Sequence, residues 1–370
     1  MIVVVGGGVV GLHVGLALAG LPGRPPIVVC EREPTPGAHT STRNSEVIHA
    51  GFAYPEDSLK ARFCVEGNPL TYEWLQRLGV AHVRSGKWIT AASAAERAGL
   101  EEVLRVGALV GVPGLRVVEG DELARAEPGG LRALAAVHSP TSGILDAAAY
   151  VAALARCFEA HDDCHLLAPC AVRAVDPMAR EIVTSQGRST YTLLVNAAGL
   201  WADEVFRLTG GGRRFRIVPF KGEYYRWRRG PILSLIYGVP RRYLPGTTAD
   251  PRLVSHMGIH AHRAVDGTVY VGPTQADRPA DRKDDYRIET PREVFAAAAA
   301  AIARLADPDD LEPAYAGNRP KLYEGPLPIG DFHIESDGAH VHLLGIESPG
   351  LTAAPALARH VAELVRQRLA

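Results

Sequence analysis

The chain has almost no excess of charge of either sign. Its 370 residues include 40 Lys and Arg against 41 Asp and Glu, which gives a formal net charge of −1. No general field therefore draws it to nucleic acid or to an anionic membrane, so we expect no nucleic-acid partner. Selectivity for an anion must come from individual arginines and lysines.

Cysteines and long apolar runs are also scarce. The five cysteines are odd in number and form no C-x-x-C pair that would suggest zinc or redox chemistry, and we expect no metal site. Free thiols are typical of a reducing cytoplasm. The apolar residues 1–21 lack a basic start and contain three consecutive glycines, so they predict neither a signal peptide nor a transmembrane segment. We expect a cytoplasmic protein, with peripheral membrane association as the alternative.

The order of patterns predicts a mixed α/β protein. A strand over 1–5, a helix over 9–19 and a strand over 27–31 form a βαβ unit. Residues 34–54 are too rich in Gly, Pro, Ser and Thr for regular structure, and loops of this length are usually functional. Helices are expected over 58–78, 94–110 and 291–305, from Asp146 as N-cap to 160, and from 351 onward. Strands are expected over 86–91, 191–196 and 341–344, with a series of short strands from 215 to 271.

These elements indicate two interleaved domains. We expect a Rossmann-like FAD-binding domain made of residues 1–85, 140–212 and 315–370. Residues 86–139 and 213–314 would form a substrate domain with an antiparallel sheet. Interleaving follows because strand-to-glycine turns recur early, in the middle and late in the chain.

A dinucleotide site begins directly after the first strand. Gly6, Gly8 and Gly11 fit G-x-G-x-x-G, in which the glycines permit the tight turn, the approach of a pyrophosphate and close packing of helix on strand. The pyrophosphate then meets free amides at a helix N-terminus. Glu31 follows Gly11 by 20 residues at the end of the second strand, where a carboxylate can accept hydrogen bonds from ribose hydroxyls.

Three later features favour FAD over NAD. Arg43, Asn44 and Ser45 lie in the long loop, residues 194–202 read LVNAAGLWA, and residues 347–352 end in a helix N-terminus that could stabilise a reduced flavin. The predicted cofactor-binding residues are Gly6, Gly8, Gly11, Glu31, Arg32, Thr40, Arg43, Asn44, Ser45, Val172, Ala198, Gly199, Trp201, Gly350, Leu351 and Thr352.

Several blocks together resemble the D-amino-acid-oxidase-like FAD superfamily, and within it the L-2-hydroxyglutarate dehydrogenase/oxidase family. They are HTSTRNSEVIHAGFAY at 39–54, SLKA at 58–61, Cys64, Gly86-Lys87, IVPFKGEY at 217–224, GIH at 258–260, DG at 266–267 and VGP at 271–273. The resemblance covers nearly the whole chain. Lys221 stands where that family usually has Arg, and residues 317–321 and 345–350 also depart from its pattern. His39 and His49 lie where a covalent flavin link could form, but the resemblance implies non-covalent FAD.

The implied reaction is oxidation of a small 2-hydroxy acid, similar to L-2-hydroxyglutarate, to the 2-keto acid, with hydride passing to flavin N5. An FAD-dependent amino-acid or amine oxidase is the alternative. The acceptor that reoxidises the flavin would be O2, a quinone or an electron-transfer protein.

The reaction needs a base and cations for the carboxylate. His260 is the first candidate for the base, because histidine titrates near neutrality, and His49 is the second. His256 and His262 share the face of His260 if the strand is regular. The predicted carboxylate-binding cations are Arg319 and Lys321, followed by Lys221 and Arg43. Glu347 could bind a substrate amine or cap the last helix.

Overall fold

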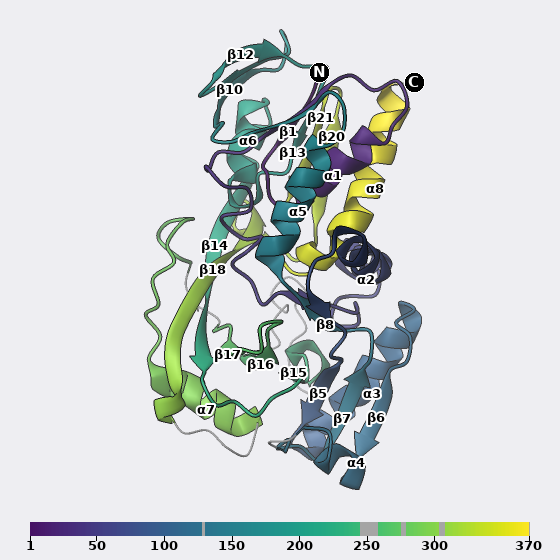
Figure 1. Ribbon diagram of the computed structural model, residues 1–370, viewed down its shortest axis with the longest axis vertical. Helices are drawn as coiled ribbons and strands as arrows, with labels where there is room; N and C mark the ends of the chain where they lie inside the picture. Colours follow the sequence, from purple (N-terminus) through teal and green to yellow (C-terminus); the bar gives the residue numbers. More distant parts are fainter. Residues whose placement is uncertain (128–129, 245–257, 275–278, 303–307, 370) are drawn as a thin grey trace.

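Two large sheets, one above the other in Figure 1, organise the protein. The computed structural model describes residues 1–127, 130–244, 258–274, 279–302 and 308–369. The helices are α1 (Val9–Ala19), α2 (Leu59–Leu78), α3 (Ala94–Leu109), α4 (Gly120–Ala124), α5 (Ala147–Glu159), α6 (Ala202–Leu208), α7 (Arg292–Ile302) and α8 (Gly350–Leu369). Three short 3-10 turns are η1 (Gly199–Trp201), η2 (Arg241–Tyr243) and η3 (Pro308–Asp310).

The upper sheet contains the predicted βαβ unit. Its order is β20 (His333–Asp337), β21 (His340–Leu344), β13 (Leu193–Asn196), β1 (Ile2–Val5), β2 (Ile27–Cys30) and β9 (Cys164–Leu167). All neighbours are parallel except β20 and β21. Its strands come from the beginning, middle and end of the chain, as the recurring glycine turns predict. The Rossmann-like fold is confirmed.

The lower sheet is almost entirely antiparallel. Its order is β19 (Leu327–Ile329), β18 (Leu311–Glu324), β14 (Phe215–Trp227), β17 (Val269–Gly272), β16 (His260–Arg263), β15 (Leu235–Gly238), β5 (Lys87–Ala91), β7 (Ala135–Ser139) and β6 (Arg116–Glu119). Only β15 and β5 run parallel. The antiparallel sheet expected for the substrate region is therefore present.

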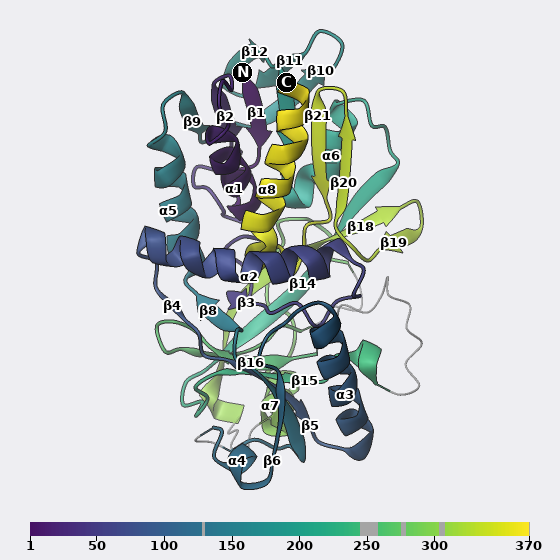
Figure 2. The same ribbon diagram turned by 90° about the vertical axis from the view of Figure 1, so that its right-hand side faces the viewer.

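Two three-stranded sheets complete the architecture. One consists of β10 (Val172–Asp176), β11 (Glu181–Thr184) and β12 (Gly187–Thr190), and the other of β3 (Val47–Ile48), β8 (Gly143–Leu145) and β4 (His82–Val83). The second lies where the chain passes between the large sheets. In Figure 2, α2 runs crosswise between the upper helices and the lower sheet.

Local sequence signals located most helices correctly. Asp146 caps α5 as expected, since its Oδ1 accepts a hydrogen bond of 2.8 Å from the amide of Ala149. The expectation of only short strands from 215 onward was wrong, because residues 215–227 form the single long strand β14. The predicted end of the Ala-rich helix, beyond Ile302, lies outside the described residues.

The predicted domain boundaries stay a prediction. One of them, between residues 314 and 315, falls inside β18, which pairs with β14 from Leu311 opposite Trp227 to Glu324 opposite Phe215. This long pair extends from the lower sheet toward the upper part of the molecule (Figure 1). It therefore links the two predicted domains.

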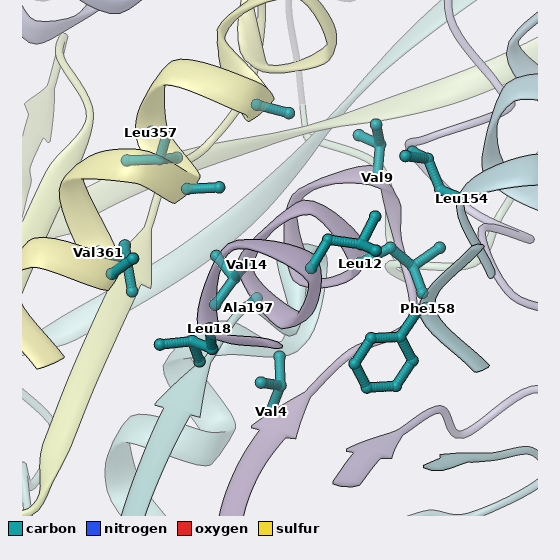
Figure 3. Close-up of a cluster of buried hydrophobic side chains, with 14 of the residues drawn as sticks. Val4, Val9, Leu12, Val14, Leu18, Leu154, Phe158, Ala197, Leu357 and Val361 are labelled. Carbon is teal, nitrogen blue, oxygen red and sulfur yellow. The ribbon is translucent and has the colours of Figure 1, made fainter. Parts of the chain in front are cut away.

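A hydrophobic core fixes the helices on the upper sheet. Figure 3 shows Leu12 of α1 on the side of Phe158 of α5 and Val14 of α1 on the side of Leu357 of α8, and all four side chains are fully buried. Burying each such side chain stabilises the fold by about 1.5–3 kcal/mol. Packing of α1 against β1 and α8 in this way holds the N-terminus of α1 in place. Among the described helices, none combines the length and the apolar character that crossing a membrane requires.

Candidate active site

A cavity extends from the glycine turn of the upper sheet to the strands of the lower sheet. Fourteen of the sixteen predicted cofactor residues line it: Gly6, Gly8, Glu31, Arg32, Thr40, Arg43, Asn44, Ser45, Val172, Ala198, Gly199, Trp201, Gly350 and Leu351. The other two, Gly11 and Thr352, lie behind the wall. The structure thus brings together residues that are up to 345 positions apart, although their contacts with a cofactor stay a prediction.

The glycine turn between β1 and α1 has no room for side chains. Gly6 has a φ of +109°, and a Cβ on it would clash with the carbonyl of Ala197. A Cβ on Gly11 would clash with the carbonyl oxygen of Gly6. Gly8 precedes α1 without a capping side chain of its own and lines the cavity. The turn therefore offers backbone and a helix N-terminus to whatever enters, as a pyrophosphate requires.

Glu31 ties the end of β2 to this turn. Its Oε2 accepts a hydrogen bond of 2.7 Å from the amide of Gly7, and its Oε1 accepts one of 2.8 Å from the amide of Glu33. The carboxylate is buried and lines the cavity. Its oxygens have lone pairs left for ribose hydroxyls, which is the predicted role.

Aromatic and cationic groups form the end of the cavity nearest Glu31. The Arg32 guanidinium lies 3.6 Å above the Trp201 ring, and the His39 ring centroid is 4.6 Å from that of Trp201. His39 Nε2 lies 3.0 Å from the Glu33 carboxylate. The two rings are inclined by 58° and Arg32 covers one face of Trp201, so this end of the cavity combines aromatic and cationic groups.

Thr352 holds the long loop against α8 instead of lining the cavity. Its Oγ1 accepts a hydrogen bond of 3.0 Å from the amide of His49 and donates one of 3.3 Å to the carbonyl of Val47. These bonds place His49 beside the first turn of α8, close to Ser348. The loop and the helix start, far apart in sequence, therefore form one wall.

His260 faces the cavity from the lower sheet. Its ring stacks on Tyr237 with centroids 3.8 Å apart, and neither ring nitrogen has a hydrogen-bond partner among the residues that the structure describes. Burial holds the pKa of His260 well below its ordinary value, so the ring is neutral. His262 lies on the same face with its ring centroid 5.6 Å away, as the alternation predicts, whereas His256 lies outside the described residues. The hydroxyl of Tyr237 is also buried and has no partner in the described part of the chain.

His49 faces the same space and has partners on both ring nitrogens. Its Nδ1 lies 3.3 Å from Lys87 Nζ, and its Nε2 lies 3.5 Å from Ser348 Oγ. Burial, and then the nearby Lys87, hold the pKa of His49 well below its ordinary value. Tyr54 lies next in this polar row, with its hydroxyl 3.2 Å from Ser348 Oγ.

The four predicted cations fall into two groups. Arg319 and Arg43 line the cavity. The Arg319 guanidinium has no hydrogen bond or salt bridge to any residue that the structure describes. Lys321 instead pairs with Glu347 at 2.9 Å, and Lys221 pairs with Asp285 at 3.1 Å. Neither lysine lines the cavity. The Arg43 guanidinium lies 4.2 Å above the ring of Tyr286, whose hydroxyl is bonded to His39 at the Glu31 end, so of these four cations Arg319 is the one positioned near His260.

Glu347 is the centre of a buried ion cluster. Its Oε1 accepts from Lys60 at 2.7 Å and from Lys321 at 2.9 Å. Burial alone would raise the pKa of Glu347, but the two lysines outweigh it and lower the pKa to about 2. The Oε2 atom has no partner among the described residues. Glu347 is therefore an anion at neutral pH, held at the cavity wall.

Several residues of this site were not predicted from the sequence as site residues. Tyr54, Tyr224 and Tyr237 line the cavity, and Lys87 lies directly behind His49. Lys87 is only 1% exposed, on the strand sequence K-W-I-T-A. A lysine at the start of an apolar strand was the available signal, since such a residue is almost never fully buried without a reason.

Comparison with known proteins identifies the family of this chain. The family described as FAD dependent oxidoreductase matches residues 1–364. The chain belongs to this family. It is therefore an FAD-dependent oxidoreductase, as its glycine turns predict, and FAD is its cofactor.

Two relatives of this FAD-dependent oxidoreductase are both named L-2-hydroxyglutarate dehydrogenase. The mitochondrial L-2-hydroxyglutarate dehydrogenase of Arabidopsis thaliana is 31% identical over 97% of this chain and 82% of its own length. The L-2-hydroxyglutarate dehydrogenase of Escherichia coli K12 is 27% identical over all of this chain and 93% of its own. The predicted resemblance to that family is confirmed.

Solved structures share the fold at lower identity. The L-α-glycerophosphate oxidase of Mycoplasma pneumoniae, with FAD bound, has a TM-score of 0.84 at 22% identity and covers 100% of this chain and 94% of its own. The L-proline dehydrogenase of P. horikoshii has a TM-score of 0.81 at 19% identity and covers 99% and 93%. The glycine oxidase of Bacillus cereus has a TM-score of 0.77 at 18% identity and covers 99% and 97%. These likenesses show the FAD-oxidoreductase fold.

The cavity fits FAD by its own chemistry. The side-chain-free turn at Gly6 and Gly8 admits a pyrophosphate, and the Glu31 carboxylate lies where a ribose would follow. The start of α8 at Gly350 lies at the opposite end, near His49 and His260. A helix N-terminus there can stabilise negative charge on a bound ring system.

Proposed function

We propose that this FAD-dependent oxidoreductase oxidises a small L-2-hydroxy acid of the 2-hydroxyglutarate kind to the 2-keto acid. The observation that carries the proposal is Arg319, a cavity-lining guanidinium without an acceptor in the described part of the chain, facing the same space as His49 and His260. A guanidinium in this state can bind a carboxylate by two parallel hydrogen bonds. The shared name of the relatives supports the same substrate class.

The residues have separate tasks in this reaction. Bound FAD supplies the acceptor for a hydride at flavin N5. Arg319 holds a substrate carboxylate, and the partnerless nitrogens of His260 and hydroxyl of Tyr237 offer hydrogen bonds to the polar groups of the substrate.

We further propose that His49, the second candidate from the sequence, is the base. A base needs a neighbour that orients it, and His49 has Lys87 at one nitrogen and Ser348 at the other, whereas His260 has none in the described chain. The hydroxyl proton of the substrate would pass to His49 Nε2, which faces Ser348 at the cavity wall.

An amino-acid oxidase is the second candidate function. The partnerless Oε2 of Glu347 favours it, because a carboxylate oxygen at the cavity wall can accept a hydrogen bond from a substrate ammonium group. Two lysines already neutralise Glu347, however, which leaves little charge to attract a further cation. The hydroxy acid therefore remains the better fit.

The test is the kinetic effect of Arg319→Ala. Removing one partner of a charge pair in a partly buried site costs about 2–5 kcal/mol, so kcat/KM for L-2-hydroxyglutarate should fall tenfold or more, mainly through KM. Arg226→Ala, which removes an exposed arginine paired with Glu312, is the matched control and should change little. Equal kcat/KM values for wild type and Arg319→Ala would refute the assignment.

The proposal extends to the cellular location of the protein and to the acceptor that reoxidises its flavin. We propose a cytoplasmic location, supported by five cysteines that are all free thiols. Reoxidation is assigned to O2, a quinone or an electron-transfer protein.

A further inference from the structure

Lys87 is a buried cation without a counter-charge. It lies at the start of β5, is 1% exposed, and its Nζ is 4.2 Å from the centroid of the Tyr237 ring. Within the described residues it forms no salt bridge, and its one hydrogen bond is to Nδ1 of His49 at 3.3 Å. A lysine in this position is costly for the fold unless it serves the site.

The groups that face Lys87 come from four elements. They are His49 in the loop after β3, Cys64 on α2, Tyr237 on β15 and His260 on β16. Burial raises the pKa of both Cys64 and Tyr237, so neither supplies a negative charge near neutral pH. Burial lowers the pKa of Lys87 to about 7. Both protonation states of the amine are thus populated at neutral pH.

Each state of Lys87 allows a different tautomer of His49. An ammonium group can only donate, so it holds Nδ1 as an acceptor and leaves the ring proton on Nε2. A neutral amine has a lone pair and can also accept, which allows the tautomer in which Nδ1 carries the proton and donates it toward Nζ. Only in that tautomer does Nε2 present a lone pair at the cavity wall, beside Ser348 Oγ.

We propose that neutral Lys87 is the positioning residue of the base, selecting the reactive tautomer of His49 and receiving its Nδ1 proton during turnover. The inference rests on the proposed function and extends it. The proton of the substrate hydroxyl moves to His49 Nε2, and the proton on Nδ1 moves to Lys87 Nζ. The ring ends neutral, Lys87 ends as ammonium, and the hydride with its electron pair leaves the substrate carbon for FAD. Lys87 thus occupies the place that a carboxylate holds behind many catalytic histidines.

The first arm of the test measures the rate of flavin reduction by L-2-hydroxyglutarate between pH 6 and pH 8. The wild-type rate should rise about tenfold, because the neutral fraction of a group with a pKa of about 7 grows from about a tenth to nine tenths. Lys87→Met should reduce its flavin more slowly than the wild type at pH 8. Its rate of flavin reduction should vary less than about twofold between pH 6 and pH 8. Lys87→Arg, which stays charged, should remain at or below the wild-type rate at pH 6 throughout.

The control for this arm is Lys283→Met. That lysine pairs with Asp203 and Glu204 on α6, so the variant should keep the tenfold rise. FAD content and melting temperature show that each variant is folded. A tenfold rise that persists in Lys87→Met would overturn the inference.

The second arm does not depend on turnover. The ¹⁵N chemical shifts of the His49 ring in the resting holoenzyme, assigned by comparison with His49→Gln, should show the proton on Nε2 at pH 6 and on Nδ1 at pH 8.5. In Lys87→Met this exchange should disappear. An unchanged tautomer in the wild type would refute the role of Lys87, even if the hydroxy acid proves to be the substrate. A tautomer change without flavin reduction by any 2-hydroxy acid would refute only the proposed substrate.

Discussion

Two histidines at one cavity illustrate how the same residue type acquires different roles from its contacts. His260 was the first candidate from the sequence because it lies in a strand of the substrate region. The structure stacks it on Tyr237, and no described residue is hydrogen-bonded to either ring nitrogen, whereas His49 is oriented from both sides. Neither difference is encoded near the histidines themselves, since Lys87, Tyr237 and Ser348 come from other elements.

This contrast predicts different effects of two equivalent substitutions. His49→Gln should lower the rate of flavin reduction by about 10²–10⁴-fold with FAD still bound, because it removes a positioned base. His260→Gln keeps a hydrogen-bonding group and should act mainly on KM. Rapid-mixing spectroscopy with each variant measures both effects. The reverse ranking would restore His260 as the base.

At the level of elements, motifs that act locally were predictable and pairings at long range were not. The glycine turn, the Asp146 cap and the start of α8 depend on neighbouring residues, so a single sequence reveals them. The pairing of β14 with β18 joins residues about 100 positions apart. Lys221 shows the consequence. Lys221 was a candidate to bind the substrate, but its ammonium group forms salt bridges with Asp285 and Glu289 instead.

The turn before α1 yields a prediction for cofactor binding. Gly11→Ala should abolish retention of FAD, because its Cβ would clash with the carbonyl of Gly6 and displace the turn. Gly20→Ala, at the other end of α1, is the matched control, since its Cβ would meet only Ala17 O at an ordinary 3.6 Å. The ratio of flavin to protein absorbance after gel filtration measures retention. Full retention by Gly11→Ala would contradict the account of this turn.

At the scale of the whole molecule, the site exists only because the chain interleaves. The cavity joins the N-terminal turn, the loop before α2, the strands of the lower sheet and the first turn of α8. The sequence was sufficient for the fold class, the cofactor and the glycine turns that border the cavity. It was insufficient for Lys87, Tyr224 and Tyr237, because their burial depends on how strands pair within the lower sheet, and for Tyr54, which lies in the loop before α2.

Anaerobic titration of the holoenzyme with L-2-hydroxyglutarate tests the proposed oxidation of a 2-hydroxy acid most directly. Absorbance near 450 nm should bleach fully at about one equivalent of substrate, with one 2-keto acid formed per flavin, since each substrate delivers one hydride. L-glutamate, which differs only in carrying an amine at C2, should leave the flavin oxidised over the same time. Bleaching by L-glutamate and not by L-2-hydroxyglutarate would contradict the account and identify an amino-acid oxidase instead.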